Sequence, residues 1–197
     1  MKKIYLIRHA DSVQNAGEVT SSPEKISLSL VGHRQATELV TKLTDTPDLI
    51  VVSEYLRTQQ TAEPVIQKFS ATPVETWNIH EFTYLNSDRC TNMNAQMRKP
   101  LIEEYWKRNN PWHKDGGNAE SFDQFLHRIN SFFVKIRSRK EDVTYIFTHG
   151  QFILGSKMIL ENEGMPSYAT LKTWMSEFHQ RSLKEIVLNA SVLEINM

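Results

Sequence analysis

Four short segments rich in apolar residues constrain the fold of this chain more than any other feature of its sequence. They span residues 4–7, 49–52, 143–147 and 192–195, and a weaker candidate lies at 73–77. An uninterrupted apolar run such as 4–7 is typical of a strand that is buried on both faces of a parallel sheet. We therefore expect these segments to form a central sheet.

Helical patterns lie between the predicted strands. Apolar residues recur at helical spacing over 32–43, 61–69 and 122–136, and each pattern predicts a helix with one buried stripe. Residues 95–108 are a further predicted helix, in which Pro100 must sit in the first turn or split the helix. Alternating strands and helices predict an α/β fold, a three-layer sandwich with a mostly parallel central sheet flanked by helices.

The chain is expected to form a single domain over residues 1–197, because it contains no internal repeat, low-complexity tract or linker. Residues 81–118 are its least regular part, with two prolines, two adjacent glycines and several asparagines. Segments of this kind often cover active sites. We expect 81–118 to be an insertion that lies over the top of the sheet as a lid.

The charge of the chain is balanced, with 23 Lys plus Arg against 23 Asp plus Glu. Nucleic-acid and membrane-surface binding both favour a broad excess of positive charge, so we expect neither partner. The apolar run at 4–7 is too short for a signal-peptide core or a membrane span, which predicts a cytoplasmic protein. The single cysteine, Cys90, excludes a disulfide framework and a cysteine metal cluster, and nothing in the sequence indicates an oligomeric state.

Charged side chains directly follow three of the predicted strands. Arg8 and His9 follow the first strand, Arg57 comes shortly after the second, and His149 follows the third. Open parallel sheets bind ligands at the carboxyl ends of their strands. We therefore expect two arginines and two histidines to meet at one edge of the sheet.

This combination of side chains suits phosphoryl transfer. Guanidinium groups match phosphate oxygens and neutralise charge in the transition state, and a neutral imidazole is a competent nucleophile. Nearby arginines should lower the pKa of His9 and keep it free to attack. His149 could donate to a phosphate oxygen, and a helix that starts after Gly150 would add backbone N–H donors.

Several segments, taken together, resemble the histidine phosphatase superfamily, also called the phosphoglycerate mutase-like family. Residues 6–15 resemble its signature, Arg-His-Gly followed by Ser and Asn. The other matching segments are 28–36, 53–62, 117–122 with Phe125 and Arg128, 148–150 and 189–192. The matches follow in the family's order and span residues 4–195.

The resemblance implies a phosphomonoester hydrolase that works through a phosphohistidine intermediate. His9 would be the nucleophile, and Glu81 would be the general acid that protonates the leaving oxygen and then activates water. The remaining pocket residues implied are Arg8, Asn15, Arg57, His149 and Gly150. No metal or cofactor is implied, because the arginines fill the electrostatic role that magnesium takes elsewhere.

One position departs from the family pattern, and the roles of several other side chains stay open. Ala10 stands where the motif has glycine, so we expect an altered but working loop. Arg89, Arg98 and Lys99 either reach an anionic part of the substrate or form a solvated face. The five other histidines lack metal-ligand spacing and are expected to be surface or packing residues: His33, His80, His113, His127 and His179.

Within the family, the length of 197 residues favours a phosphatase over a mutase, since mutases carry extra lid and contact segments. The insertion favours a small phosphorylated metabolite over a phosphoprotein. A catalytically silent binding relative is the alternative from another class, but the nucleophile and arginines that such a relative would lack are present. A P-loop or dinucleotide-binding protein is disfavoured because the sequence has no glycine-rich phosphate loop.

Overall fold

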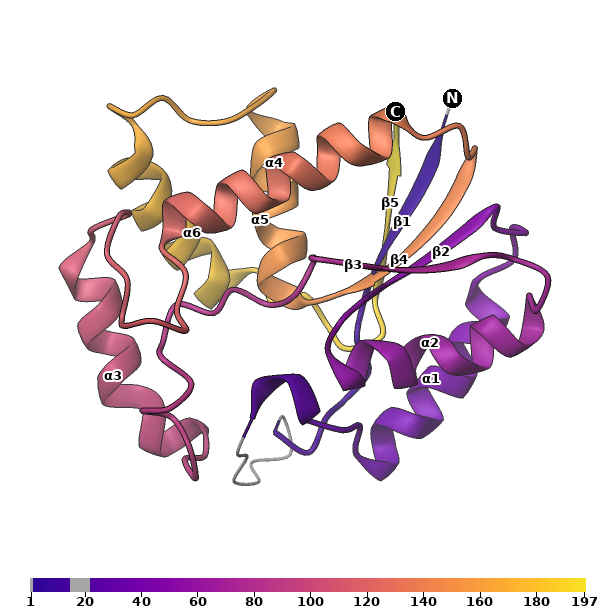
Figure 1. Ribbon diagram of the computed structural model, residues 1–197, viewed down its shortest axis with the longest axis horizontal. Coiled ribbons are helices and arrows are strands. Elements are labelled where there is room, and N and C mark those ends of the chain that lie inside the picture. Colours follow the sequence, from indigo (N-terminus) through magenta and orange to yellow (C-terminus); the bar gives the residue numbers. More distant parts are fainter. Residues whose placement is uncertain (1, 15–21) are drawn as a thin grey trace.

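The computed structural model describes residues 2–14 and 22–197, which contain a five-stranded sheet (Figure 1). Its strands are β1 (Lys3–Arg8), β2 (Leu49–Ser53), β3 (Val74–Trp77), β4 (Val143–Thr148) and β5 (Val192–Asn196). They lie in the order β3-β2-β4-β1-β5. All neighbouring pairs are parallel except β1 and β5, which are antiparallel. The predicted, mostly parallel sheet is confirmed.

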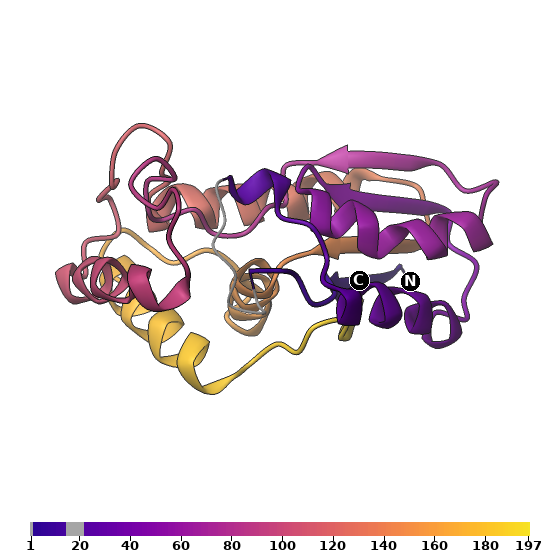
Figure 2. The same ribbon diagram turned by 90° about the horizontal axis from the view of Figure 1, so that it is seen from below.

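Helices cover both faces of this sheet and complete the α/β sandwich. The helices of the described residues are α1 (Leu30–Lys42), α2 (Leu56–Lys68), α3 (Ala95–Arg108), α4 (Phe122–Ser138), α5 (Gly150–Glu161) and α6 (Leu171–Lys184), with a 3-10 turn, η1 (Pro23–Lys25). Figures 1 and 2 place α3 at the end of the molecule opposite α1 and α2.

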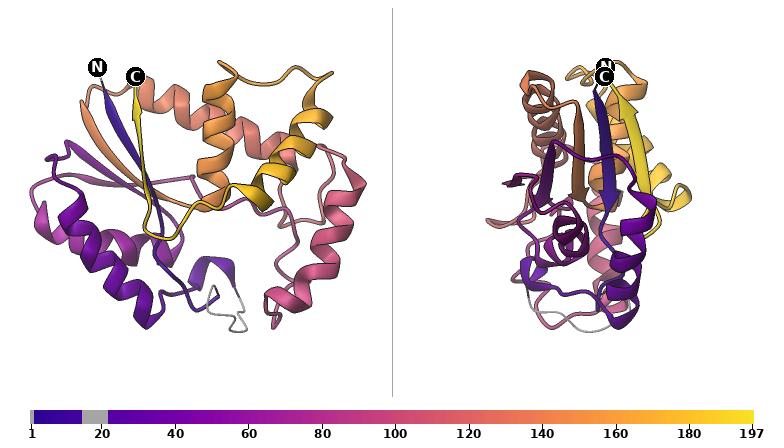
Figure 3. Two further views of the ribbon diagram at one scale, coloured as in Figure 1. Left: turned by 180° about the vertical axis from the view of Figure 1, so that it is seen from behind. Right: turned by 90° about the vertical axis from the view of Figure 1, so that its right-hand side faces the viewer.

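Strand residues alternate between two apolar cores, one on each face of the sheet. Ile7 and Ile50 belong to the core formed with α1 and α2. Ile4, Leu6 and Val51 belong to the larger core formed with α4, α5 and α6. Figure 3 shows the sheet and these helices from behind and from the side. The three-layer arrangement therefore follows from the burial of both faces of the strands.

Three details of the predicted helices are corrected by the structure. The second helix begins at Leu56 and not at residue 61, and its N-cap, Tyr55, makes no side-chain capping bond. The helix Ala95–Arg108 continues through Pro100, which is neither in its first turn nor at a break. Helix α6 was not predicted, although its buried residues Leu171, Trp174, Met175 and Phe178 recur at helical spacing.

The register of the strands brings their carboxyl ends together. Arg8 of β1 is paired with Thr148 of β4, and Val52 of β2 with Phe147. His9 and His149, which follow the paired residues, therefore emerge side by side, with Ser53 on the neighbouring strand. No helix within the described ranges is long and apolar enough to cross a membrane.

Candidate active site

The two histidines predicted at the strand ends face each other. The ring centroids of His9 and His149 are 5.2 Å apart and the ring planes meet at 60°. The backbone of His9 is fixed on both sides, since its N–H donates to the Thr148 carbonyl at 2.9 Å. Its own carbonyl accepts from the Asn189 side chain at 3.1 Å and from the Ala190 N–H at 3.3 Å. The nucleophile candidate therefore stands on a backbone held by two neighbouring segments.

The ring of His9 is buried, with 3% of the residue exposed. Its Nδ1 lies 2.7 Å from the carbonyl oxygen of Ala10, which only accepts hydrogen bonds. Nδ1 therefore carries the proton, and the lone pair of a neutral ring is on Nε2. The backbone N–H of Ala10 donates to Thr61 Oγ1 at 2.9 Å. Ala10 is not among the described residues with a positive φ, so this loop closes without a glycine conformation.

Arg57 connects the second histidine to the rest of the pocket. Its Nη2 donates to His149 Nδ1 at 3.1 Å, and its Nη1 donates to the Pro23 carbonyl at 2.7 Å. Since Nδ1 accepts, the ring proton of neutral His149 is on Nε2, which donates to Ser53 Oγ at 3.1 Å. Both ring nitrogens of His149 therefore have protein partners, and donation to a phosphate would require the bond from Nε2 to Ser53 to be exchanged.

Burial keeps both histidines neutral. It is the main cause that places the pKa of His9 and of His149 well below 6.5, and the charge of Arg57 is the next cause. From the sequence we expected a lowered pKa for His9 only, and the arginines were its expected cause. Burial also lowers the pKa of Arg57 to about 10, so its guanidinium stays charged at neutral pH.

Arg8 lies on the other side of the histidines. Its Nη1 donates to the Val187 carbonyl, and its Nε is buried with no hydrogen-bond partner among the described residues. A Cβ on Gly150 would lie 3.3 Å from this Nε. Glycine at position 150 therefore lets the guanidinium of Arg8 approach the start of α5 closely. We refer to Arg8, His9, Arg57 and His149 as the strand-end cluster.

Glu81 lies within reach of both arginines. Its carboxylate opposes the burial effect that lowers the pKa of Arg8 and of Arg57. Glu81 Oε1 accepts from the backbone N–H of Gln151 at 2.9 Å and of Phe82 at 3.2 Å. Gln151 is the second residue of α5. The helix N-terminus that was expected to hold a substrate anion thus holds a carboxylate in this structure.

Two cavities adjoin Glu81. The larger, of about 670 Å³, is lined on one side by Tyr55, Arg57 and His80, and on the other by residues of the insertion. The smaller, of about 290 Å³, is lined by Arg8, Gly150 and Val187 among others. Glu81 and Gln151 line both. Arg57 thus borders one cavity and Arg8 the other, with Glu81 in the lining of both, whereas His9 and His149 are in the lining of neither.

The three cations of the insertion, residues 81–118, differ in where they lie relative to the larger cavity. Arg98 lines the larger cavity and donates to the Met93 carbonyl at 2.7 Å. Lys99 lies outside its lining, with 73% of its side chain exposed, and Arg89 is paired with Asp115. Only Arg98 of these three cations is therefore placed to meet a substrate. Asn15, the further predicted phosphate contact, lies outside the described residues.

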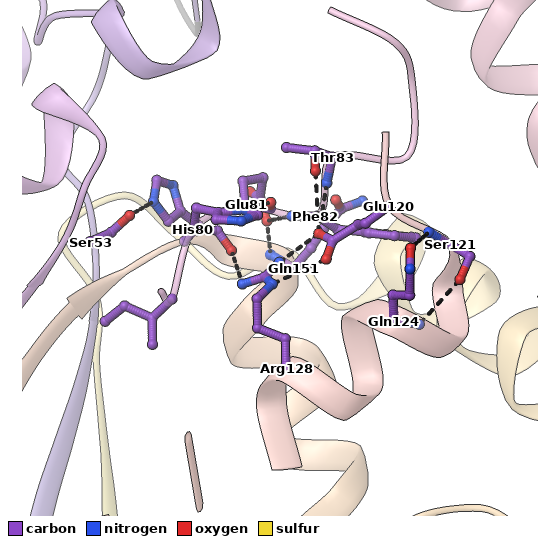
Figure 4. A network of polar contacts seen from close by, with 12 residues as sticks. Ser53, His80, Glu81, Phe82, Thr83, Glu120, Ser121, Gln124, Arg128 and Gln151 are labelled. Carbon is purple, nitrogen blue, oxygen red and sulfur yellow. Dashed lines mark hydrogen bonds and ion pairs between the residues drawn. The ribbon is translucent and has the colours of Figure 1, made fainter. Parts of the chain in front are cut away.

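A network of polar contacts surrounds the loop that carries Glu81 (Figure 4). It includes His80, Thr83, Glu120 and Arg128, none of which sequence reasoning had given a role in the site. His80 stacks on Tyr55, with centroids 5.4 Å apart and planes at 8°. Its packing role was expected, but its place in the cavity wall was not. In the part of the chain that the structure describes, no group of three or more His, Cys, Asp or Glu side chains is placed to hold a metal ion.

Comparison with known proteins identifies the family. The profile of the histidine phosphatase superfamily (branch 1) matches residues 4–181. No curated protein sequence matches the chain.

Three solved structures illustrate the likeness in fold. The α-ribazole phosphatase from Shigella flexneri is 22% identical, with a TM-score of 0.72 over 99% of this chain and 90% of that chain. A mycobacterial glucosyl-3-phosphoglycerate phosphatase is 18% identical, with a TM-score of 0.73 over 100% and 91%. Phosphoserine phosphatase from Entamoeba histolytica, in complex with 3-phosphoglyceric acid, is 17% identical, with a TM-score of 0.68 over 98% and 90%. At these identities the likeness establishes the fold.

Proposed function

The chain belongs to the histidine phosphatase superfamily, as its motifs predicted, and from this premise we propose that it is a metal-independent phosphomonoesterase that forms phosphohistidine on His9. One observation carries the proposal. A buried, neutral His9 with a free lone pair on Nε2 stands 5.2 Å, centroid to centroid, from a second histidine to which a charged arginine donates.

In the first step, Nε2 of His9 attacks phosphorus. The N–P bond forms as the bond from phosphorus to the leaving oxygen breaks, and a protonated Glu81 carboxyl gives its proton to that oxygen. In the second step, Glu81 takes a proton from water, which attacks phosphohistidine. The N–P bond breaks, and His9 and inorganic phosphate are released. Glu81 ends protonated, ready for another cycle.

Positive charge for this chemistry comes from the protein. Arg57 is 5% exposed, and a charged donor in so dry a site stabilises a transferring phosphoryl group strongly. Arg8 approaches the start of α5 and has a buried Nε that is available to a phosphate oxygen. His149, once the contact of its Nε2–H with Ser53 is exchanged, supplies a further donor. The proposal needs no metal ion because these side chains carry the electrostatic role.

The larger cavity supports a small phosphorylated metabolite as the substrate. Its volume of about 670 Å³ is that of a site for a small organic molecule and exceeds the needs of phosphate alone. Besides Glu81, the lining combines aromatic rings, among them Tyr55 and Tyr84, with the carboxylates of Glu24 and Glu54. The three solved structures described above are phosphatases for small phosphorylated compounds by their names. We propose that this cavity takes the leaving group.

The test is hydrolysis of 4-nitrophenyl phosphate by purified protein in the presence of a chelator. We expect steady release of 4-nitrophenolate, at least a 1000-fold lower rate in His9→Ala because the nucleophile is lost, and unchanged activity in His127→Ala. His127 is a matched control because its side chain lies on the surface of α4, 67% exposed. Acid-labile phosphate should be retained on the wild-type protein and not on His9→Ala.

Two results would overturn the proposal. Equal activity in the wild type and His9→Ala would exclude His9 as the nucleophile. Conversion of 3-phosphoglycerate to its 2-isomer faster than phosphate release, with a bisphosphoglycerate primer, would make the protein a mutase instead.

A further inference from the structure

An ion pair between Arg128 of α4 and Glu120 of the preceding loop contacts the backbone on both sides of Glu81. Arg128 Nη2 lies 2.6 Å from Glu120 Oε1, and Arg128 Nε lies 3.1 Å from Glu120 Oε2, so the pair is bidentate. The two side chains are only 9% and 14% exposed. A bidentate pair of this kind fixes the orientation of both partners.

Each partner of the ion pair also makes a hydrogen bond to the backbone of the loop that carries Glu81 (Figure 4). Arg128 Nη1 donates to the carbonyl of His80 at 2.9 Å. Glu120 Oε1 accepts from the N–H of Thr83 at 3.1 Å. The residues held are the one before Glu81 and the second one after it. The pair therefore restrains the backbone on both sides of Glu81.

Further contacts fix the ion pair and the loop to each other and to α4. The N–H of Glu120 donates to the Thr83 carbonyl at 3.0 Å, which closes a second contact with the same loop. Ser121, the next residue, caps α4 in a reciprocal capping box with Gln124. Phe82 stacks on Phe125 of α4, with centroids 4.4 Å apart and planes at 16°. The loop is thus fixed to a capped and buried helix.

Neither member of the ion pair lines the cavities on either side of Glu81. Direct contact with a substrate in those cavities is therefore not their function. A contribution to folding stability does not explain this ion pair either, because apolar residues of similar volume often stabilise a protein as much as a poorly exposed ion pair does. What this pair does that an apolar pair would not is to hold two specific backbone groups.

We propose that Arg128 and Glu120 are positioning residues for Glu81, and that they hold its carboxyl where it delivers a proton to the leaving oxygen. This inference rests on the proposed function, in which Glu81 is the general acid. The restraint matters most for esters whose leaving oxygen cannot depart without a proton. Such esters depend on the position of the acid, whereas 4-nitrophenolate departs readily without one.

The experiment compares kcat/KM for two substrates, 4-nitrophenyl phosphate and the phosphate ester of a primary alcohol such as propyl phosphate. The main variant is the double change Arg128→Met with Glu120→Leu, which removes the pair without leaving a buried charge. We expect about a 30-fold loss with the alkyl ester and less than about a 3-fold loss with the aryl ester, because general acid catalysis contributes about 100- to 10,000-fold. In a Glu81→Gln background, the double change should add no further loss with the alkyl ester.

The controls separate positioning from folding. Arg137→Gln changes another arginine of α4, one whose guanidinium lies over Phe133 and not on the loop, and should leave both substrates unaffected. Arg128→Lys keeps the charge but loses the fork, and should shift the ratio of the two substrates in the same direction. This variant carries the test if the double variant does not fold.

Equal losses with both esters, or a full additional loss in the Glu81→Gln background, would overturn the positioning role. Unchanged kinetics in Arg128→Lys and in the double variant would also overturn it. A wild-type protein that hydrolyses neither ester would instead refute the proposed function, and the inference would fall with it.

Discussion

Arg57 of the strand-end cluster and residues of the insertion line the same cavity, yet the two regions are built differently. In the cluster, His9, Arg57 and His149 are at most 5% exposed, and their side chains have protein partners. In the insertion, the pair of Arg89 with Asp115 lies at the surface, with 48% of the arginine side chain exposed. These side chains of the cluster are thus enclosed at the edge of the sheet, whereas this ion pair of the insertion borders solvent.

Glycines show the same difference in packing. A Cβ on Gly32 of α1 would lie 1.9 Å from the carbonyl oxygen of Asp11, two residues after His9. A Cβ on Gly117 of the insertion would meet nothing within 4 Å. Position 117 therefore has space for an added methyl group, and position 32, beside the loop after His9, has none. This difference between the two regions can be tested in four ways, given from the largest expected effect to the smallest.

Replacing Arg57 by lysine should cause the largest loss. Lysine keeps a positive charge but cannot bond to Pro23 and His149 together through a planar fork. We expect kcat/KM for 4-nitrophenyl phosphate to fall about 100-fold, the usual cost of losing one preorganised donor. Steady-state kinetics with a thermal melt would check this. A loss below about 5-fold would show that the fork is not needed.

Gly32→Ala should destabilise the protein by about 1–3 kcal/mol, because the added methyl group pushes α1 away from the loop after His9. Gly117→Ala is the matched control and should change the free energy of unfolding by less than about 0.5 kcal/mol. Urea denaturation of both variants measures the difference. Equal effects would show that the two regions tolerate added volume alike.

Stability should decrease as the pH falls below about 6.5, the ordinary pKa of histidine in an unfolded chain. The folded-state pKa values of His9 and His149 are lowered, so below that pH the unfolded chain binds protons that the folded chain does not. Each histidine then contributes a slope of about 1.4 kcal/mol per pH unit. Urea denaturation at several pH values should give a smaller slope for His149→Asn, and an unchanged slope would contradict the prediction.

Arg98→Ala should have the smallest effect, about a 3-fold rise in KM for a metabolite that reaches the insertion, because it removes one exchangeable contact in an open site. Lys99→Ala, outside the cavity lining, is the control and should leave KM unchanged. A screen of phosphorylated metabolites with both variants provides the measurement. A larger effect of Lys99→Ala would contradict the placement of these side chains.

The sheet and the composition of its carboxyl edge were predictable because both depend on local patterns. Apolar runs located β1, β2, β4 and β5, and the charged residues after three of them indicated one site. The early start of α2 was missed because Tyr55 is not a capping residue, so the sequence carries no start signal there. Helix α6 did carry its signal, in the spacing of its apolar residues.

The remaining features depend on how distant segments are aligned. Ser53 meets His149 only because β2 and β4 are in register, and their residues are far apart in the sequence. Arg128 and Glu120 belong to a segment with family resemblance, but their hold on the loop around Glu81 arises from the packing of α4. No spacing rule along the chain encodes such contacts, so the positioning pair became visible only in three dimensions.

The position of β1 in the sheet has a consequence for how the protein folds during translation. His9 is translated well before the residues that hold its backbone, since its N–H is bonded to Thr148 and its carbonyl to Asn189 and Ala190. The strand that carries it has no partner in the sheet until β4 and β5 have been made. A nascent chain therefore carries His9 without these backbone partners until the segments that contain β4 and β5 have both been made.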